Sequence, residues 1–535
     1  MYIEPSTNIK ILHNVPLDNT YDHTIAFDDA TSQYNYFAGL VKVNCTNYTY
    51  QRQNKGMLRV EGKADDYFDC NYMMFQNTRF GTKWFYAFIN SVNYINNQTT
   101  EIEFEIDVMQ TWYFDCDLGE CFIERTHTLS DAIGDNIVPE SLDVGEYVYN
   151  SYGDLTDTDF DLNDMYVVIA VNDVEDTDLG NVYDGTYGCA TLYGFSCDST
   201  ADLQLISAFI HILTQAQKAD AIIGMYMCPK FLIGTLPSDH KIPYTVSGRQ
   251  KVFTIPLVTK NDTLDGYIPK NAKMYTYPYN YLHVDNGNGT NLSLRYEFAS
   301  RDTGINGILL IATGTISQPV AVSLRPSNYK GVNRQTINPA DTLNTEVLEI
   351  NSFPLCSWSI DAYQAWVANG ALPLSGNTLT NNVSSAGKFT AGVLGSASMP
   401  ASFYTNVVGN VAGLLRETYL ASTMADITRG NFNNGGVNVS CKKNNFYYGR
   451  CSVQRQYAKM IDDYFTMYGY AIKSVGRIQK QARPHWTYIK TVGCVIAGSI
   501  PSDDSRKIIE IYDRGITFWR NGNEVGNYEL DNRPS

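Results

Sequence analysis

A strictly alternating segment constrains the fold of this chain more than any other feature. Between residues 101 and 108 every second side chain is apolar, and the side chains between them are all carboxylates. A period of two residues is typical of a half-buried β-strand. The apolar set is Ile102, Phe104, Ile106 and Val108. We predict a partner strand at residues 84–89, with a turn at residues 96–98 between the two.

A second hairpin is predicted further along the chain. Its first strand runs from Met274 to Val284, its turn is the Asp-Asn-Gly-Asn-Gly run at residues 285–289, and its second strand alternates from Leu292 to Phe298. Asn-Gly is the strongest short-range signal for a hairpin turn. A short apolar strand is also expected at residues 166–171, with acidic stretches at 154–164 and 173–178 as the exposed loops around it.

Two helices are predicted from apolar residues at helical spacing. One covers residues 205–216 and the other covers residues 457–468. Gly469 is expected to end the second helix, because glycine readily adopts the left-handed conformation that follows a helix. Both apolar stripes are interpreted as core packing rather than as a cofactor site.

The chain of 535 residues is longer than one hydrophobic core usually supports. Its 39 tyrosines suit strands and interfaces, since tyrosine buries an apolar ring and keeps a hydroxyl for a partner. We therefore expect a multi-domain, mainly β fold with α+β insertions. The predicted division is an N-terminal β domain at 1–145, an inserted α/β region at 146–265, a β domain at 266–365, an apolar segment at 366–440 and a C-terminal α+β portion at 441–535.

Residues 366–415 form a segment with a single charged side chain, Lys388. An exposed loop of this length is normally polar and charged. Residues 389–415 carry no charge, and as a helix they would extend roughly 40 Å, more than the ~30 Å hydrocarbon core of a bilayer. Asn406 and Asn410, together with Pro400, argue against a permanent transmembrane helix.

Two interpretations of this segment stay open on composition alone. It is either membrane-active on release from an oligomer, or an apolar plug or interface that never meets lipid. The side chains expected to carry membrane activity are Phe389, Val393, Leu394, Met399, Phe403, Val407, Val408, Val411, Leu414 and Leu415.

The sequence contains no residue pattern that clearly indicates a catalytic, cofactor-binding or metal site. The seven histidines lack the paired spacing of a zinc protease helix. Cys116 and Cys121 have no second Cys/His pair of the zinc-finger type, so packed thiols are favoured. The run at residues 157–161 begins like a calcium loop but has Leu162 and Val168 where glycine and glutamate are needed, so solvated carboxylates are favoured over an irregular calcium site.

Charge and cysteine content restrict the partners and the compartment. A net charge of −16 argues against gripping nucleic acid through its phosphates. Eleven scattered cysteines indicate mostly reduced, buried thiols, which fits assembly in a cytoplasm. The polar residues 1–10 lack the pattern of a signal peptide.

Several blocks of sequence resemble one known family. They are YMMFQN (72–77), GTKWFYAF (81–88), FEIDVMQTW (104–112), CFIERTH (121–127), the weaker KMYTYPY (273–279), YFTMYGYAI (464–472), WTYIKT (486–491) and YDRGITFW (512–519). In this order and spacing they resemble the tail-knob, or distal-tube, proteins of small podophages with protein-primed DNA replication, the small Bacillus podophage type. No such block falls between Asp131 and Leu264.

The resemblance implies a structural virion protein of the phage tail and not an enzyme. It implies a β-rich hexameric tube, contacts with other tail or collar proteins, and genomic DNA that passes through without specific binding. It also implies that the uncharged loop closes the channel and later acts on the host cell membrane. Six copies would carry a charge of roughly −96, six times −16, a field that repels DNA if enough of it lines the bore. A cell-wall hydrolase and a receptor-binding tail protein remain as alternative hypotheses.

Overall fold

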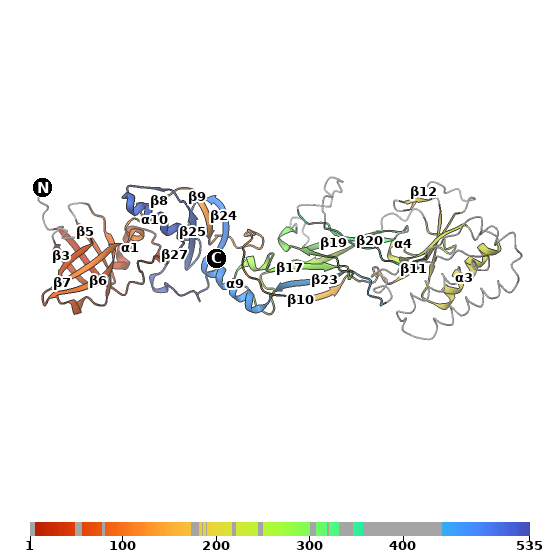
Figure 1. The fold of residues 1–535 in the computed structure, drawn as a ribbon, viewed down its shortest axis with the longest axis horizontal. Helices are drawn as coiled ribbons and strands as arrows, with labels where there is room; N and C mark the ends of the chain where they lie inside the picture. Colours follow the sequence, from red (N-terminus) through yellow and green to blue (C-terminus); the bar gives the residue numbers. More distant parts are fainter. Residues whose placement is uncertain are drawn as a thin grey trace, which may run out of the picture. The chain divides into compact units, whose positions relative to one another are not determined.

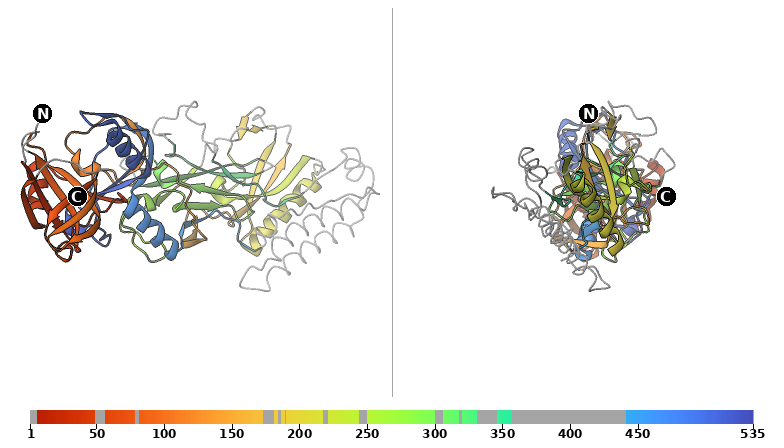
Figure 2. Two further views of the ribbon diagram at one scale, coloured as in Figure 1. Left: turned by 60° about the vertical axis from the view of Figure 1, so that its left-hand side comes forward. Right: turned by 90° about the vertical axis from the view of Figure 1, so that its right-hand side faces the viewer.

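The computed structural model divides the chain into two compact units. Unit 1 comprises Met1–Tyr147, Thr259–Tyr279 and Val453–Ser535, and unit 2 comprises Val148–Val258 and Asn280–Ser452. Each unit therefore combines segments that are far apart in the sequence, as the mixed colours in Figure 1 and Figure 2 show. The division into five consecutive segments stays a prediction. The residues described are 6–48, 56–77, 81–172, 181–183, 186–188, 190–216, 221–243, 250–299, 306–317, 320–330, 346–356 and 441–534.

Unit 1 contains a six-stranded antiparallel sheet that has apolar cores on both of its faces. The strand order is β3-β1-β5-β6-β7-β4, with β1 Thr7–His13, β3 Val41–Tyr48, β4 Met57–Glu61, β5 Cys70–Asn77, β6 Phe85–Asn96 and β7 Thr99–Ile106. In β5, Tyr72 and Met74 pack into one core while Cys70 and Met73 pack into the other. Burial on both faces explains why residues 72–75 in the middle of β5 form a continuous apolar run.

The hairpin predicted from the alternating segment is confirmed, except at its end. β6 and β7 pair across the turn at residues 97–98, but β7 stops at Ile106. Asp107 is buried and caps α2, Val108–Thr111, by accepting from the backbone N–H groups of Met109 and Gln110 at 3.0 and 3.1 Å. The prediction of Asp107 as an exposed strand residue is wrong, because a carboxylate with partners for its oxygens can be buried at a helix start.

The second sheet of unit 1 combines strands from the N-terminal and the C-terminal parts of the sequence. Its order is β2-β27-β25-β9-β24, with β2 His23–Ile25, β9 Cys121–Thr126, β24 Tyr470–Gly476, β25 Trp486–Val492 and β27 Ile516–Trp519. One face packs with α1, Ala30–Ala38, and α10, Ser502–Arg514, into the core that contains Phe37, Ile511 and Phe518. A two-stranded sheet of β8 Asp117–Leu118 and β26 Ile496–Ala497 completes the unit.

The predicted C-terminal helix is confirmed as α9, Arg455–Tyr468. Gly469 follows it with a φ of 65°, a value that glycine adopts without the strain other residues incur. A Cβ atom at Gly469 would also collide with the backbone of Thr126, the last residue of β9, and of His127, which follows it. The helix end and the close approach to β9 therefore both require glycine.

The described residues of unit 2 form three four-stranded sheets and a two-stranded one. Their orders are β10-β23-β17-β18, β14-β11-β15-β22, β16-β19-β20-β21 and β12-β13. The strands are β10 Tyr147–Asp154, β11 Met165–Val171, β12 Asn181–Tyr183, β13 Thr186–Gly188, β14 Thr191–Ser196, β15 Ile222–Pro229, β16 Gln250–Pro256, β17 Asn280–Asp285, β18 Asn291–Leu294, β19 Gly307–Thr315, β20 Ala321–Pro326, β21 Leu348–Ile350, β22 Leu355–Cys356 and β23 Tyr447–Val453. The mainly β fold class is confirmed.

The other predicted elements of unit 2 are confirmed with shifted ends. β11 and the helix α3, Thr200–Gln215, lie where they were expected, and β17 pairs with β18 as a hairpin. The first hairpin strand begins only at Asn280, because residues 272–275 form a 3-10 turn. Tyr296 and Phe298, predicted as strand residues, lie in a second 3-10 turn.

Candidate functional site

The ten apolar side chains expected to act on a membrane, from Phe389 to Leu415, lie outside the described residues. Their role stays a prediction. Within the part of the chain that the structure describes, no helix is both long enough and apolar enough to cross a bilayer.

A buried ionic cluster connects three distant segments of unit 1. Glu140 pairs with Arg125 and with Lys273, and it also accepts from the backbone N–H of Ala471 at 3.1 Å. The side chains of Glu140 and Lys273 are only 3% and 2% exposed. Burial, and then the neighbouring Arg125 guanidinium, lower the pKa of Lys273 to about 7. A cation in this position needs Glu140, because an uncompensated buried charge is costly.

A second buried carboxylate, Asp462 of α9, holds residues 267–271, which precede the 3-10 turn at residues 272–275. It accepts from the Tyr267 hydroxyl at 2.8 Å, from the Lys270 N–H at 2.7 Å and from the Asn271 N–H at 3.0 Å. Burial raises its pKa, although these hydrogen bonds act in the opposite direction. Its oxygens are thus used to fix backbone rather than to face a ligand.

His127 has a single tautomer defined by its two neighbours. Its Nδ1 accepts from the Tyr488 N–H at 2.8 Å, so the proton is on Nε2, which donates to the Thr466 carbonyl at 3.1 Å. Burial, assisted by the charge of Arg483, lowers the pKa of His127 to about 3. A neutral imidazole with both nitrogens engaged serves as a structural link between β25 and α9 and not as a general base.

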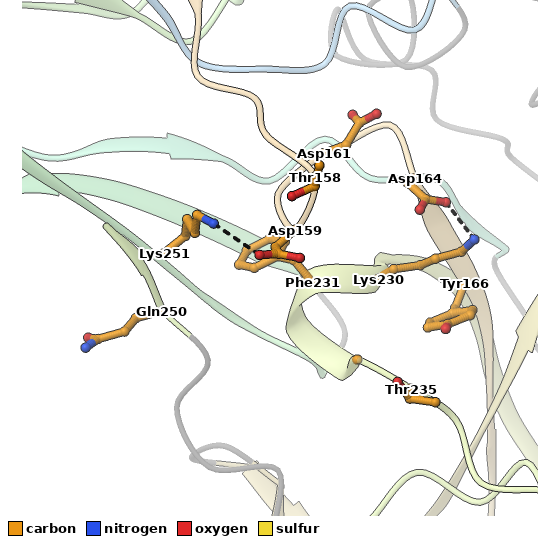
Figure 3. A pocket seen from close by; sticks show the side chains of 11 residues that line it. Thr158, Asp159, Asp161, Asp164, Tyr166, Lys230, Phe231, Thr235, Gln250 and Lys251 are labelled. Atoms are coloured by element: carbon orange, nitrogen blue, oxygen red, sulfur yellow. Dashed lines mark ion pairs between the residues drawn. The ribbon is translucent and has the colours of Figure 1, made fainter. Parts of the chain in front are cut away.

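Unit 2 has an open pocket of about 900 Å³ at the acidic loop before β11. Its walls come from this loop, from α4, Lys230–Ile233, and from the start of β16. Figure 3 shows Lys251 beside Asp159, 3.6 Å away, and Lys230 paired with Asp164 at 2.7 Å. Lys251 also pairs with Asp157 at 2.5 Å. The two lysines offset part of the charge of the carboxylates around them, so the pocket offers a solvated polar surface with an excess of carboxylates.

In the described residues, the structure gives no support to the zinc and calcium sites considered from the sequence. Across the described residues, no group of three or more His, Cys, Asp or Glu side chains is arranged to hold a metal ion. At the calcium-like run, Leu162 is fully buried and Asp161 accepts from the N–H and side chain of Asn163. Burial raises the pKa of both Cys116 and Cys121, which favours the thiol over the metal-binding thiolate.

An exposed apolar row on the five-stranded sheet was missed from the sequence. Val475, Phe122 and Val492 are direct neighbours across β24, β9 and β25, and they are 68%, 40% and 55% exposed. α9 covers the other end of this face, where Trp486 Nε1 donates to the Thr466 carbonyl at 3.0 Å. Three isolated residues give no periodic signal, so only the strand register brings them together.

Two family models match the chain. The model described as the C-terminal domain of tail knob protein gp9 of Bacillus phage phi29 matches residues 248–533, more than half of the chain. The model of the N-terminus of the caudoviral major tail protein matches residues 5–117.

Individual relatives extend the similarity over nearly the whole chain, including residues 131–264. The chain is 26% identical to tail knob protein gp9 of Bacillus phage PZA and 26% identical to that of Bacillus phage phi29, with 98% of each chain covered in both cases. The structure of the tail knob protein gp12 of bacteriophage C1 superposes with a TM-score of 0.59 at 13% identity, covering 98% of this chain and 99% of that one. At this identity the likeness shows a shared fold alone.

Proposed function

Because the chain belongs to the family of the phage tail knob proteins, and is therefore a structural component of the virion tail rather than an enzyme, we propose that it forms a hexameric ring that conducts DNA. In this proposal the uncharged segment of each copy plugs the channel and later penetrates the host membrane. Other tail proteins and the host membrane are its partners, and DNA is a passing cargo.

The observation that carries the membrane step is the composition of residues 366–415. This stretch has a single charged side chain, so its apolar side chains need a shielded environment. The chain that contains it aligns end to end with tail knob proteins. A ring supplies that shield before infection, since neighbouring copies cover one another's apolar side chains. After release into lipid, small residues allow segments of neighbouring copies to pack closely, and the amides of Asn406 and Asn410 can form hydrogen bonds between copies.

The charge of the subunit supports a conduit over a DNA-binding site. Counterion release requires clustered lysine and arginine, whereas this chain has a net charge of −16. A closed ring of such subunits favours sliding of a polyanion over retention. Six tethered segments also act at a high effective concentration, so weak individual affinity for lipid is sufficient.

The test compares the whole chain with a variant that lacks residues 384–413. Both proteins are imaged for rings and mixed with dye-loaded vesicles of phosphatidylglycerol and phosphatidylethanolamine. We expect rings from both proteins and dye release from the whole chain only. A control variant replaces the same residues with a Gly-Ser linker of equal length, which separates loss of the apolar side chains from shortening of the chain. Equal release by all three proteins would refute the membrane role.

A further inference from the structure

The five-stranded sheet of unit 1 ends in two edge strands with opposite charge. β24 forms one edge and β2 forms the other. Residues 464–502, which include β24, contain lysine and arginine but no aspartate or glutamate. Residues 11–41, which include β2, contain aspartate but no lysine or arginine. The fold therefore places the exposed cations at β24 and the exposed carboxylates that flank β2 at opposite edges of one sheet.

The cationic edge is accessible and partly apolar. Lys473 and Arg477 are exposed on and just after β24, and Val475 lies between them. Val475 is the outermost member of the apolar row that continues through Phe122 and Val492. An exposed apolar row with a cationic border is typical of a protein contact, since burial of the row provides the attraction and the charges select the partner.

The anionic edge presents side chains rather than free backbone. Thr24 and Ile25 of β2 are buried, and the buried Gln110 of α2 donates through Nε2 to the Ile25 carbonyl at 2.8 Å, so β2 is closed to strand pairing and the segments that flank it form the accessible surface of this edge. Two arginines on this side donate to carbonyl oxygens, Arg514 to Thr20 and Arg520 to Gln481. Four exposed carboxylates outnumber them: Asp18, Asp22, Asp28 and Asp29.

We propose that the β24 edge of one copy docks against the β2 edge of the next copy in the ring. This inference rests on the proposed ring and assigns its contact within unit 1. The two edges differ in charge and lie on the same sheet, so every copy offers one edge of each kind. A heterologous contact of this type repeats around an axis and closes a ring with no edge left over.

A second interpretation of Lys473 and Arg477 predicts a different result. Charged side chains on an edge strand also protect it from aggregation, as does the irregular register of β24 beside Lys473. Glutamate would protect the edge equally well, whereas docking on an anionic surface requires a positive charge. Reversing the sign of the charge therefore separates docking from protection.

The experiment uses three charge-reversed forms of the full chain and a matched control. One form carries Lys473→Glu and Arg477→Glu, the second carries Asp18→Lys and Asp22→Lys, and the third carries all four changes. The control, Lys459→Glu with Arg506→Glu, changes the net charge by the same amount on exposed positions of α9 and α10. Mass photometry and negative-stain images measure ring formation over a dilution series.

Each reversed edge should raise the concentration for half-assembly at least ~100-fold, because like charges then face each other across the contact. The variant with all four changes should have a concentration for half-assembly within ~10-fold of that of the unaltered protein. The control should have the same concentration for half-assembly as the unaltered protein. Assembly of the reversed-edge variants at the same concentration as the control would overturn the edge contact while leaving the ring intact. Absence of rings from the unaltered protein would overturn both the contact and the proposed ring.

Discussion

Acid should destabilise unit 1 through the buried His127, and replacing this residue should remove that effect. In the folded chain the imidazole is neutral, with its Nδ1 accepting from Tyr488 and its Nε2 donating to Thr466. Glutamine at this position keeps a donor for the Thr466 carbonyl but does not titrate. The variant His127→Gln therefore isolates the cost of keeping an imidazole unprotonated.

The magnitude follows from the two pKa values. The pKa of His127 falls from 6.5 to about 3 on folding, chiefly by burial. A histidine with a lowered folded pKa contributes stability that is present above the unfolded pKa and is lost as the pH falls below it. At about pH 4.5 the unfolded chain is protonated and the folded chain is not, which costs about 3 kcal/mol relative to neutral pH.

The assay is urea unfolding at about pH 7.5 and about pH 4.5, with hydrogen exchange of the β25 amides as a local measure. At neutral pH His127→Gln should be less stable by roughly 1–2 kcal/mol, because the Tyr488 N–H loses its acceptor. At the lower pH this difference should vanish or reverse. His485→Gln, at a half-buried histidine bonded to Glu524, should keep the acid sensitivity. Loss of equal stability with acid in His127→Gln and in the unaltered chain would refute the reasoning.

Three further substitutions test the packing of unit 1 in the same unfolding assay. Glu140→Ala should cost ~4 kcal/mol by leaving the largely buried Arg125 and Lys273 side chains without their carboxylate partner, whereas Glu124→Ala, at a partly exposed ion pair, should cost less than ~1 kcal/mol. Gly469→Ala should cost more than Gly493→Ala, because both residues have positive φ but only the first meets a backbone within contact distance; equal costs would contradict the close approach to β9. Burial raises the pKa of Asp107 to about 6, so the folded chain loses stability as the pH rises and this carboxyl group ionises. The free energy of unfolding of Asp107→Asn should therefore rise by ~3 kcal/mol relative to that of the unaltered chain between about pH 4 and pH 7.5. A difference between the two proteins that does not change with pH would contradict this.

Short-range patterns predicted the secondary structure well where one period governs a segment. The β6–β7 hairpin, the strand β11 and the helices α3 and α9 were all expected from residue spacing and turn residues. The errors fall at ends of elements, where a single side chain changes its role. Asp107 shows this: its alternation with apolar neighbours fits a strand, but its oxygens cap a helix and hold the Tyr72 hydroxyl at 2.7 Å.

Local sequence alone determined the mainly β class, two of the hairpins, the helices α3 and α9, and the presence of a nearly uncharged segment, because each depends on residues within a few positions of one another. Tertiary structure decided which distant segments share a sheet. It placed β2 and β24 at the two edges of one sheet, brought Glu140 to Lys273, and aligned Val475 with Phe122 and Val492. These pairings depend on strand register and on burial of charges between segments more than a hundred residues apart, and no periodicity along the chain encodes them.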